Sequence, residues 1–245
     1  MSPPPQLSVV LPIYNESEAI VPVLRELAEV LTQAFPEAWE VLAVDDGSAD
    51  DTAERIREAA EKFPGIRLVS LAQNVGQSGA LWMGFRESRA DWIATLDADG
   101  QNDPADLPKL WAQRADADAV FGYRAVRKDT WSKRKGSKLA NGVRNLILRE
   151  EIRDTGCAVK IFKKSLTERL MPWNGMHRFF GSLFRMQEAR IVQVAVNHRP
   201  RAAGTSKYTN WGRLKKTVRD LFAMRWLRDR YVHVQLRLPP EAKPE

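Results

Sequence analysis

Two carboxylates stand two residues apart in the segment LDADG (96–100), directly after an apolar run. In extended backbone this spacing points the side chains of Asp97 and Asp99 the same way. Paired carboxylates suit Mg²⁺ or Mn²⁺, which prefer oxygen ligands and leave positions for phosphate oxygens. Gln101 can add a carbonyl oxygen. The segment predicts a site for a divalent metal and a diphosphate, and the alternative is a solvated acidic turn, which D-x-D alone favours.

Three other polar segments follow apolar runs, namely PIYNE (12–16), DDGSADD (45–51) and QNVGQSGA (73–80). Ligands of an open parallel sheet bind at the carboxyl ends of its strands, so these loops and the D-x-D loop should converge on one crevice. No G-x-G-x-x-G or P-loop pattern is present, which leaves a metal as the natural neutraliser of a diphosphate. Asp46 either accepts hydrogen bonds from a base or ribose or forms an Asx-turn before the next helix.

The apolar runs that carry these loops alternate with segments of helical pattern. Strands are expected at 7–12, 39–44, 66–71, 92–96 and 119–123, and helices at 17–35, 52–63, 76–89 and 103–114. Ser17 is the expected cap of the first helix. This alternation predicts right-handed βαβ units and a mostly parallel α/β sheet flanked by helices. Further strands are expected at 158–162 and 190–200.

Charge is unevenly distributed along the 245 residues, whose formal net charge is +7. Residues 1–120 hold 9 Lys and Arg against 21 Asp and Glu, whereas residues 121–245 hold 29 against 10. This split indicates carboxylates that hold a cation and basic residues that meet an anionic partner. A nucleic-acid-binding protein is the alternative from another class, but it leaves the strand-end loops unexplained, and we expect no nucleic-acid partner. The single cysteine, Cys157, excludes an internal disulfide and fits a reducing, cytosolic setting.

These motifs together resemble the family-2 glycosyltransferases of the GT-A fold. The segments that carry the resemblance are VVLPIYNES (9–17), VLAVDDGSADDT (41–52), NVGQSGAL (74–81), TLDADGQNDP (95–104), GYR (122–124), DTGCAVKIF (154–162) and RPRAAGTSKY (199–208). Within the family, the chain is most similar to polyprenyl-phosphate transferases of the dolichol-phosphate mannosyltransferase type. The resemblance implies a GT-A, Rossmann-like domain over residues 7–210, divided into a nucleotide-sugar-binding half (7–123) and an acceptor-binding half (124–210).

The resemblance also implies roles for single residues. Those that line the nucleotide base and ribose would be Pro12, Tyr14, Glu16, Val44 and Asp46. The metal and diphosphate segment would be Asp97, Ala98 and Asp99, with Gln101 as a further metal ligand. Arg124 would face the donor diphosphate or the acceptor phosphate, and Arg201 and Lys207 would grip the lipid phosphate. Many relatives carry a bulkier residue where this chain has Gly100, but the Gln is kept.

The implied reaction is metal-dependent, inverting transfer of a hexose from a nucleoside-diphosphate sugar to a polyprenyl or dolichyl monophosphate, with Mg²⁺ or Mn²⁺ as cofactor. GDP-mannose is the first expectation for the donor. The alternative is a UDP-sugar, with polyprenyl phosphate or a saccharide hydroxyl as acceptor. A phosphate acceptor is already an anion at pH 7 and needs no strong general base. A saccharide acceptor would need one, and Asp154 is the obvious candidate, because we expect His177, His198 and His233 to be structural.

The basic half would supply cations for the acceptor and for a membrane. Residues 124–138 are expected to form a cationic loop near the acceptor site, or else a solvated basic loop. Residues 211–232 are expected to form a basic amphipathic helix, which lies on an anionic bilayer, packs on its own domain, or does both. Residues 1–6 and 233–245 are expected to be frayed tails.

No apolar run approaches the roughly 20 residues that span a bilayer, so we expect no transmembrane segment, and the N-terminus lacks the basic region of a signal peptide. We therefore expect a peripheral protein on the cytoplasmic face of the membrane, held by basic amphipathic stretches or by an integral membrane partner. The Q-x-x-R-W motif of processive synthases is not matched, because Phe222 stands where Gln would precede Arg225 and Trp226.

Overall fold

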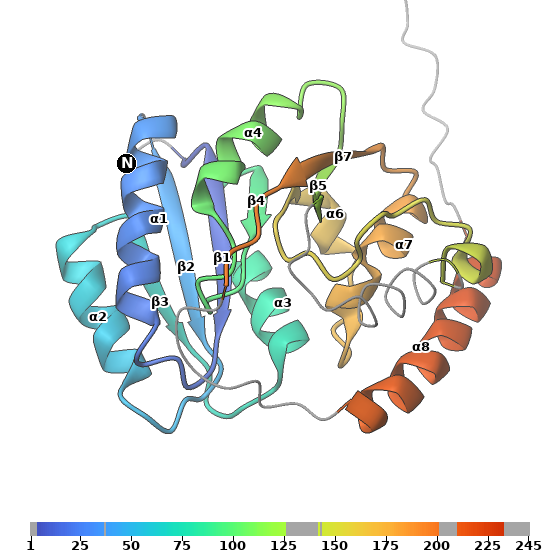
Figure 1. Ribbon diagram of the computed structural model, residues 1–245, viewed down its shortest axis with the longest axis horizontal. Coiled ribbons are helices and arrows are strands. Elements are labelled where there is room, and N and C mark those ends of the chain that lie inside the picture. Colours follow the sequence, from blue (N-terminus) through green and yellow to red (C-terminus); the bar gives the residue numbers. More distant parts are fainter. Residues whose placement is uncertain (1–3, 37, 126–141, 143, 201–209, 233–245) are drawn as a thin grey trace, which may run out of the picture.

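The computed structural model describes residues 4–36, 38–125, 142, 144–200 and 210–232, and within the last range the side chains from Val218 onward. Seven strands form one sheet in the order β3-β2-β1-β4-β6-β5-β7, with helices on both faces (Figure 1). The expected α/β fold with a mostly parallel sheet is confirmed.

The first half of the sheet consists of four parallel strands. They are β1 (Leu7–Ile13), β2 (Trp39–Asp45), β3 (Ile66–Ser70) and β4 (Trp92–Thr95). Helices cover both faces of these strands, so β1 and β2 can be apolar almost throughout, as buried parallel strands are. The sequence pattern of residues 7–12 and 39–44 reflects this double burial.

One face of the sheet is covered by α1 (Ile20–Ala34), α2 (Thr52–Lys62) and α4 (Leu107–Ala112), which pack on the side chains of Leu7, Val9 and Leu11. The opposite face is covered by α3 (Gln77–Glu87), α6 (Ser165–Glu168) and α7 (Phe180–Arg185). A short 3-10 helix (Pro104–Asp106) precedes α4, and another (Met176–Phe179) precedes α7.

The second half of the sheet contains its one antiparallel strand among the described residues. β6 (Lys160–Lys163) lies between β4 and β5 (Ala119–Arg124) and runs antiparallel to both. β7 (Ile191–Val196) pairs with β5 in parallel and is shorter than the expected strand over 190–200. The chain thus crosses from β5 to β6 and back, which brings residues 154–162 beside the D-x-D loop.

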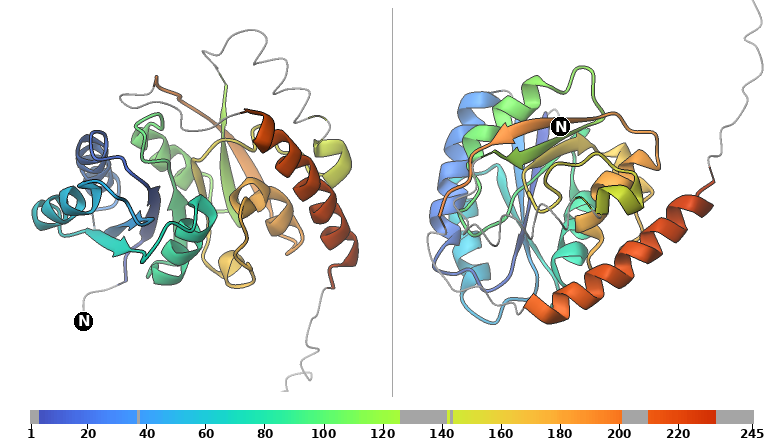
Figure 2. Two further views of the ribbon diagram at one scale, coloured as in Figure 1. Left: turned by 90° about the horizontal axis from the view of Figure 1, so that it is seen from below. Right: turned by 45° about the vertical axis from the view of Figure 1, so that its right-hand side comes forward.

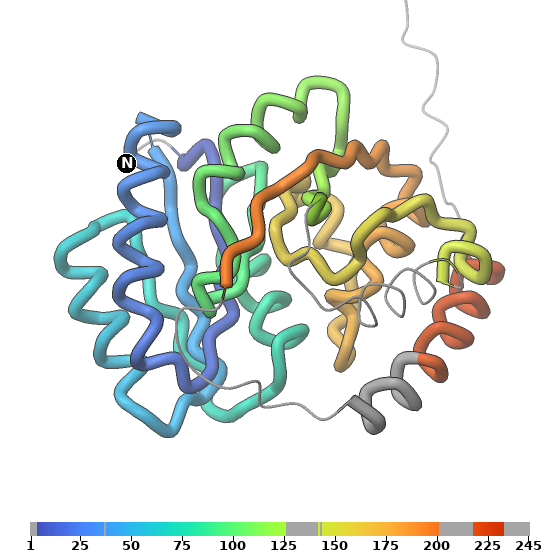
Figure 3. The backbone as a smooth tube through the Cα atoms, viewed as in Figure 1, coloured from blue at the N-terminus to red at the C-terminus, as the bar shows by residue number. Residues whose placement is uncertain are grey.

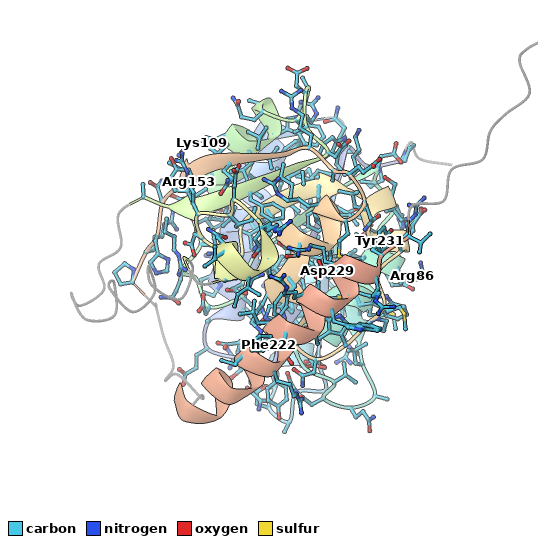
Figure 4. All side chains as sticks on the ribbon, turned by 90° about the vertical axis from the view of Figure 1, so that its right-hand side faces the viewer. Arg86, Lys109, Arg153, Phe222, Asp229 and Tyr231 are labelled. Atoms are coloured by element: carbon cyan, nitrogen blue, oxygen red, sulfur yellow. The ribbon has the colours of Figure 1, made fainter. Side chains whose placement is uncertain are left out.

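The expected C-terminal helix is present as α8 (Asn210–Arg230). It lies on the side of the molecule away from α1 and α2 (Figure 2). Leu221 and Met224 are buried against Leu148, Phe179 and Met186, so this helix packs on its own domain. Its opposite side remains exposed, with Phe222 60% and Trp226 63% accessible; Figure 4 views the helix from outside and labels Phe222.

The start of the first helix differs from the sequence prediction. Ser17 does not cap the first helix: the amides of Ala19 and Ile20 donate to the Glu16 carbonyl, and α1 begins one turn later with Ala19 at its N-cap. Among the described residues, no helix is both long enough and apolar enough to cross a bilayer.

Candidate functional site

The four predicted loops converge because β1 to β4 are parallel neighbours. Their carboxyl ends lie side by side at the same end of the sheet, which is the lower end in Figure 1. The loops are 14–19 after β1, 46–51 after β2, 71–76 after β3 and 96–103 after β4. The prediction that these distant segments converge is confirmed by the strand order, and that they form one binding site stays a prediction.

The loops after β1 and β2 are joined through Asn15, whose φ of +53° places it in the left-handed region. Its amide donates to Ser48 Oγ at 2.9 Å, and its side-chain Oδ1 accepts from the Ala49 amide at 2.8 Å. The neighbouring Glu16 amide donates to Thr52 Oγ1 at 3.0 Å. These bonds fix the backbone beside Tyr14 and Glu16, the two residues expected to line the nucleotide.

Asp46 joins the loops after β2 and β3. Its two carboxylate oxygens accept from the amides of Val75 and Gly76, each at 2.8 Å. Burial raises the pKa of this carboxyl, and the two amides oppose that rise. The Asx-turn before α2, which was the alternative role for Asp46, is instead formed by Asp50, whose Oδ1 accepts from the Thr52 amide at 3.1 Å.

A glycine is required where these loops meet. Gly47 has a φ of +68°, and a Cβ at this position would lie 2.8 Å from the Gln73 carbonyl carbon. A side chain would therefore clash with backbone as well as strain the turn. The close approach explains why Gly stands in DDGS.

The D-x-D loop is shaped by its own backbone and by α3. The Asp97 amide donates to Asn102 Oδ1 at 2.7 Å, and the Gln101 amide donates to Asp99 Oδ1 at 3.1 Å. Gly100 supplies the left-handed turn between them, with a φ of +73°. Gln77, the first residue of α3, donates from Nε2 to Asp97 Oδ1 at 2.9 Å. The D-x-D loop is thus bonded to the start of α3.

The segment after β7 closes over the other side of this loop. Asn102 and His198 form an antiparallel bridge, and the Arg199 amide donates to the Gln101 carbonyl at 3.0 Å. Arg199 also pairs with Asp103 at 2.7 Å and with Glu26 at 2.8 Å. Figure 3 shows the orange trace of this segment running back to the green D-x-D loop. Arg199, next to the last described residue of this segment, is therefore anchored to the D-x-D loop.

Arg124, at the end of β5, forms a two-point ion pair with Asp154. Its Nε lies 2.7 Å from Oδ2 and its Nη2 3.0 Å from Oδ1. Asp154 is buried and Arg124 is mostly so. Two parallel N–H···O bonds to a carboxylate are among the stronger side-chain contacts. Asp154 therefore serves to orient Arg124.

Two predicted nucleotide residues have side chains in the core. Val44 is fully buried beside α3, and Ala98 is buried in the core on the α1 side. A nucleotide contact at either would use the backbone, and their roles stay predictions. Tyr14 is 40% exposed at the site edge, and Pro12 lies in β1 opposite Val44. Arg201, Lys207, His233 and residues 126–138 of the basic loop lie outside the described residues.

Sequence reasoning missed several residues that shape the site, namely Asn15, Ser48, Asn74, Gln77 and Lys160. A signal existed for Gln77, because it begins the helix that follows a predicted site loop. His177 accepts or donates at Ser78 Oγ, 2.7 Å away, which fits the expected structural role.

The residues at the D-x-D loop fit a hard divalent cation. Its donors would be the carboxylates of Asp97 and Asp99 and the amide of Gln101, all oxygen ligands. Within the described ranges no group of three His, Cys, Asp or Glu side chains is placed to hold a metal. A donor set of two carboxylates and one amide suits Mg²⁺ or Mn²⁺ shared with phosphate oxygens and water.

A mostly parallel sheet with a D-x-D loop at its carboxyl edge defines a GT-A-type domain. The chain is similar to a glucosyl-3-phosphoglycerate synthase from Mycobacterium tuberculosis with phosphoglyceric acid (TM-score 0.67, 19% identity, 91% of this chain and 80% of that one). It is also similar to a mannosyltransferase from Pyrobaculum calidifontis with GDP-Man and Mn²⁺ (TM-score 0.66, 21% identity, 97% and 66%). At these identities the likeness shows the fold.

The chain belongs to Glycosyl transferase family 2, which it matches over residues 8–171. It is 34% identical over 225 residues to dodecaprenyl-phosphate galacturonate synthase of Rhizobium johnstonii, covering 89% of this chain. It is 34% identical over 206 residues to undecaprenyl-phosphate 4-deoxy-4-formamido-L-arabinose transferase of Edwardsiella ictaluri, covering 82% of this chain. The chain spans only 66% and 62% of the lengths of these two relatives.

Proposed function

We propose that this protein transfers a sugar from a nucleoside diphosphate to a polyprenyl monophosphate, with inversion at the anomeric carbon. The observation that carries the proposal is the D-x-D loop, bonded to α3 through Gln77 and placed beside the loops after β1, β2 and β3. The two relatives described above are named for sugar transfer to dodecaprenyl and undecaprenyl phosphate.

The donor would lie over the first half of the sheet. Asp46 and Asn15 order the loops that would line the base and ribose, with Pro12, Tyr14, Glu16 and the backbone of Val44. Asp97, Asp99 and Gln101 would hold Mg²⁺ or Mn²⁺. When bound, such an ion neutralises the diphosphate and favours its departure.

The acceptor would approach from the basic half. A phosphate oxygen forms the new bond to the anomeric carbon, while the bond from that carbon to the diphosphate oxygen breaks and the nucleoside diphosphate leaves with the electron pair. Arg124, oriented by Asp154, would offset the charge of the approaching phosphate, together with Arg201 and Lys207.

A saccharide hydroxyl as acceptor is less well supported. It would need a general base, and Asp154 already accepts two hydrogen bonds from Arg124. A carboxylate paired in this way is a weaker base, because loss of its charge would leave the guanidinium unpaired. A phosphate acceptor needs no such base.

The identity of the sugar is a separate proposal. The two relatives are named for galacturonate and 4-deoxy-4-formamido-L-arabinose rather than mannose. Another structure of the mycobacterial synthase contains Mn²⁺ and UDP, whereas the mannosyltransferase contains GDP-Man. We therefore place a UDP-sugar first and GDP-mannose second.

The exposed side of α8 would place the enzyme on an anionic membrane surface at the cytoplasmic face, alone or with an integral membrane partner. Val218, Phe222 and Trp226 recur every four residues and are all exposed, with the exposed cations Arg219 and Arg230 nearby along the helix. Apolar side chains flanked by cations are typical of interfacial helices.

The test is a transfer assay with a panel of UDP- and GDP-sugars, Mn²⁺ and a short polyprenyl phosphate. Polyprenol of the same length, which lacks the phosphate, is the matched acceptor control. We expect one donor to give a sugar-phosphate lipid and polyprenol to give none. Transfer to neither acceptor, or equal transfer to both, would contradict the proposal.

A further inference from the structure

Lys160 is a buried cation beside the site that the proposed reaction has not yet used. It begins β6, and only 5% of its surface is exposed. Its Nζ donates a hydrogen bond to the carbonyl of Cys157, three residues earlier. Lysine is almost never buried this deeply unless it is paired, so its environment matters.

The surroundings of Lys160 combine an apolar floor with charged neighbours. Its strand partners are Thr95 of β4 and Phe121 of β5, and its Nζ lies 5.5 Å from the centre of the Phe121 ring. Burial lowers the pKa of Lys160, while the nearby carboxylates of Asp97 and Asp154 raise it. The side chain thus lies between the D-x-D loop and the Arg124–Asp154 pair.

The carbonyl that Lys160 holds ends a tight turn over residues 154–157. The Cys157 amide donates to the Asp154 carbonyl at 3.3 Å, and the Gly156 amide donates to Asp154 Oδ1 at 3.2 Å. The turn also lies close to the guanidinium, since a Cβ added to Gly156 would be 3.2 Å from Arg124 Nη2. Lys160 fixes one end of this turn, and Arg124 binds the carboxylate at the other.

We propose that Lys160 is a positioning residue of the transfer reaction, which holds the turn over residues 154–157 and so fixes the guanidinium of Arg124 toward the reacting phosphates. The inference rests on the proposed function. It assigns to a side chain outside the D-x-D motif the task of holding the turn that carries Asp154, the partner of Arg124 at the end of β5.

β6 is antiparallel and short, so few hydrogen bonds between strands hold the turn that precedes it. Thr95 Oγ1 donates to the Ala158 carbonyl at 2.6 Å, and the Gly122 amide donates to the Val159 carbonyl at 2.9 Å. The Cys157 carbonyl is the next acceptor back along the chain, and the Lys160 ammonium meets it. Without that donor, the Cys157 end of the turn would lose its side-chain bond, and the turn would be held mainly through Asp154, which accepts from the amide and the guanidinium of Arg124.

A double-mutant cycle tests this linkage. The variants are K160M, which keeps the chain length but removes the donor, R124Q, and the two combined. K163M is the matched control, because Lys163 lies on the same strand and its exposed ammonium pairs with Asp118, 2.8 Å away. Circular dichroism and thermal unfolding establish that each variant is folded, and K160L, which also lacks a donor, replaces K160M in the cycle if K160M is not.

If Lys160 acts through Arg124, K160M lowers kcat by about 10- to 100-fold, the range for residues that orient a site. R124Q then lowers it at least as much, and the double variant is no slower than R124Q within about twofold. K163M stays within about twofold of wild type.

Losses that multiply in the double variant would overturn the inference, because they would mean that Lys160 acts independently of Arg124. So would a K160M variant as active as wild type. A wild-type protein that transfers no sugar contradicts the proposed function and this inference with it, whereas an active wild type with multiplying losses contradicts this inference alone.

Discussion

Three buried acids that follow strands of the first half of the sheet are held differently from two buried acids of the second half. In the first half, Asp45, Asp46 and Asp99 accept hydrogen bonds from backbone amides. In the second half, Asp154 is held by Arg124 and Glu150 by Arg144. A backbone amide fixes a carboxylate without cancelling its charge, whereas an arginine does both. The first arrangement suits a region that binds a cation, and the second suits a region where charge must be balanced.

The difference has an energetic side as well. A buried ion pair costs desolvation of two charges, and removal of one partner leaves the other uncompensated. When an acid held by backbone amides is replaced, the protein loses only those hydrogen bonds, and no unpaired charge is left behind. Substitution of Asp99 should therefore affect ligand binding more than stability, whereas substitution of Glu150 should affect stability more than ligand binding.

The largest expected effect is that of Asp99→Ala on transfer. Loss of a predicted metal ligand should reduce turnover by at least about 100-fold, as removal of one catalytic electrostatic group commonly does. The thermal midpoint should stay close to wild type, because Asp99 lies in a loop. The control is Asp91→Ala, which removes an exposed acid before the opposite end of the same strand. Near wild-type turnover of Asp99→Ala with saturating Mn²⁺ would contradict the metal assignment.

Glu150→Ala should have the largest effect on folding. Glu150 is buried, pairs with Arg144 and accepts from Ser182 Oγ. Its removal strands the buried arginine, which typically lowers the free energy of unfolding by about 3–5 kcal/mol. Urea unfolding measures this, with exposed Glu151→Ala as the matched control. A loss below about 1 kcal/mol would show that the two halves do not differ as described.

Asp46→Ala should have an intermediate effect on stability and a clear one on the loop after β3. The amides of Val75 and Gly76 lose their acceptor, which costs about 0.5–1.5 kcal/mol for each of these partly exposed hydrogen bonds. We expect faster hydrogen exchange at these two amides and a higher KM for the donor. Asp51→Ala, an exposed acid of the neighbouring turn, is the control. Unchanged exchange at Val75 and Gly76 would refute the role of Asp46 in holding this loop.

Asp118→Asn should have the smallest effect, and that effect should depend on pH. The hydrogen bond from Lys163 and the Arg190 amide hold the pKa of Asp118 below its usual value. Its contribution is therefore present above the unfolded pKa of about 3.9 and is lost as the pH falls through the folded pKa. Partly exposed pairs contribute up to about 1 kcal/mol. In thermal melts, the variant should therefore be less stable than wild type at pH 7, and this difference in melting temperature should shrink at pH 2.5. A difference that grew at pH 2.5 would contradict this expectation.

The sequence predicted the first half well because its signals are local. Apolar runs that end in polar loops identified four parallel strands, and their shared edge brought together Asp46, Asp97 and Asp99. The bonds within the site were not predictable, because the partners of Asp46 and Asp97 lie 29 and 20 residues away. Periodicity reports which side of an element is buried, but not which amide meets which carboxylate.

The second half was harder to predict from the sequence, because the number of charged residues does not show which of them pair. Arg124 was expected to face a phosphate, and the structure adds that Asp154 orients it. Lys160 had no signal at all, since a lysine at the start of a short strand is usually exposed. The helix over 211–231 was expected, but only the structure shows that Leu221 and Met224 face the core while Phe222 and Trp226 face outward.

In the function proposed above, the first half of the chain binds the donor and the second half binds the acceptor phosphate. Donor binding is measured by calorimetry with Mn²⁺ and UDP or GDP, and acceptor binding is followed through the acceptor KM. Both are measured in Asp99→Ala and in Arg201→Ala. We expect Asp99→Ala to lose binding of the metal and nucleotide. Arg201→Ala should keep that binding but raise the acceptor KM by about 10-fold or more, as loss of a charged hydrogen bond of about 1.5–3 kcal/mol implies. Equal loss of nucleotide binding in both variants would contradict the division.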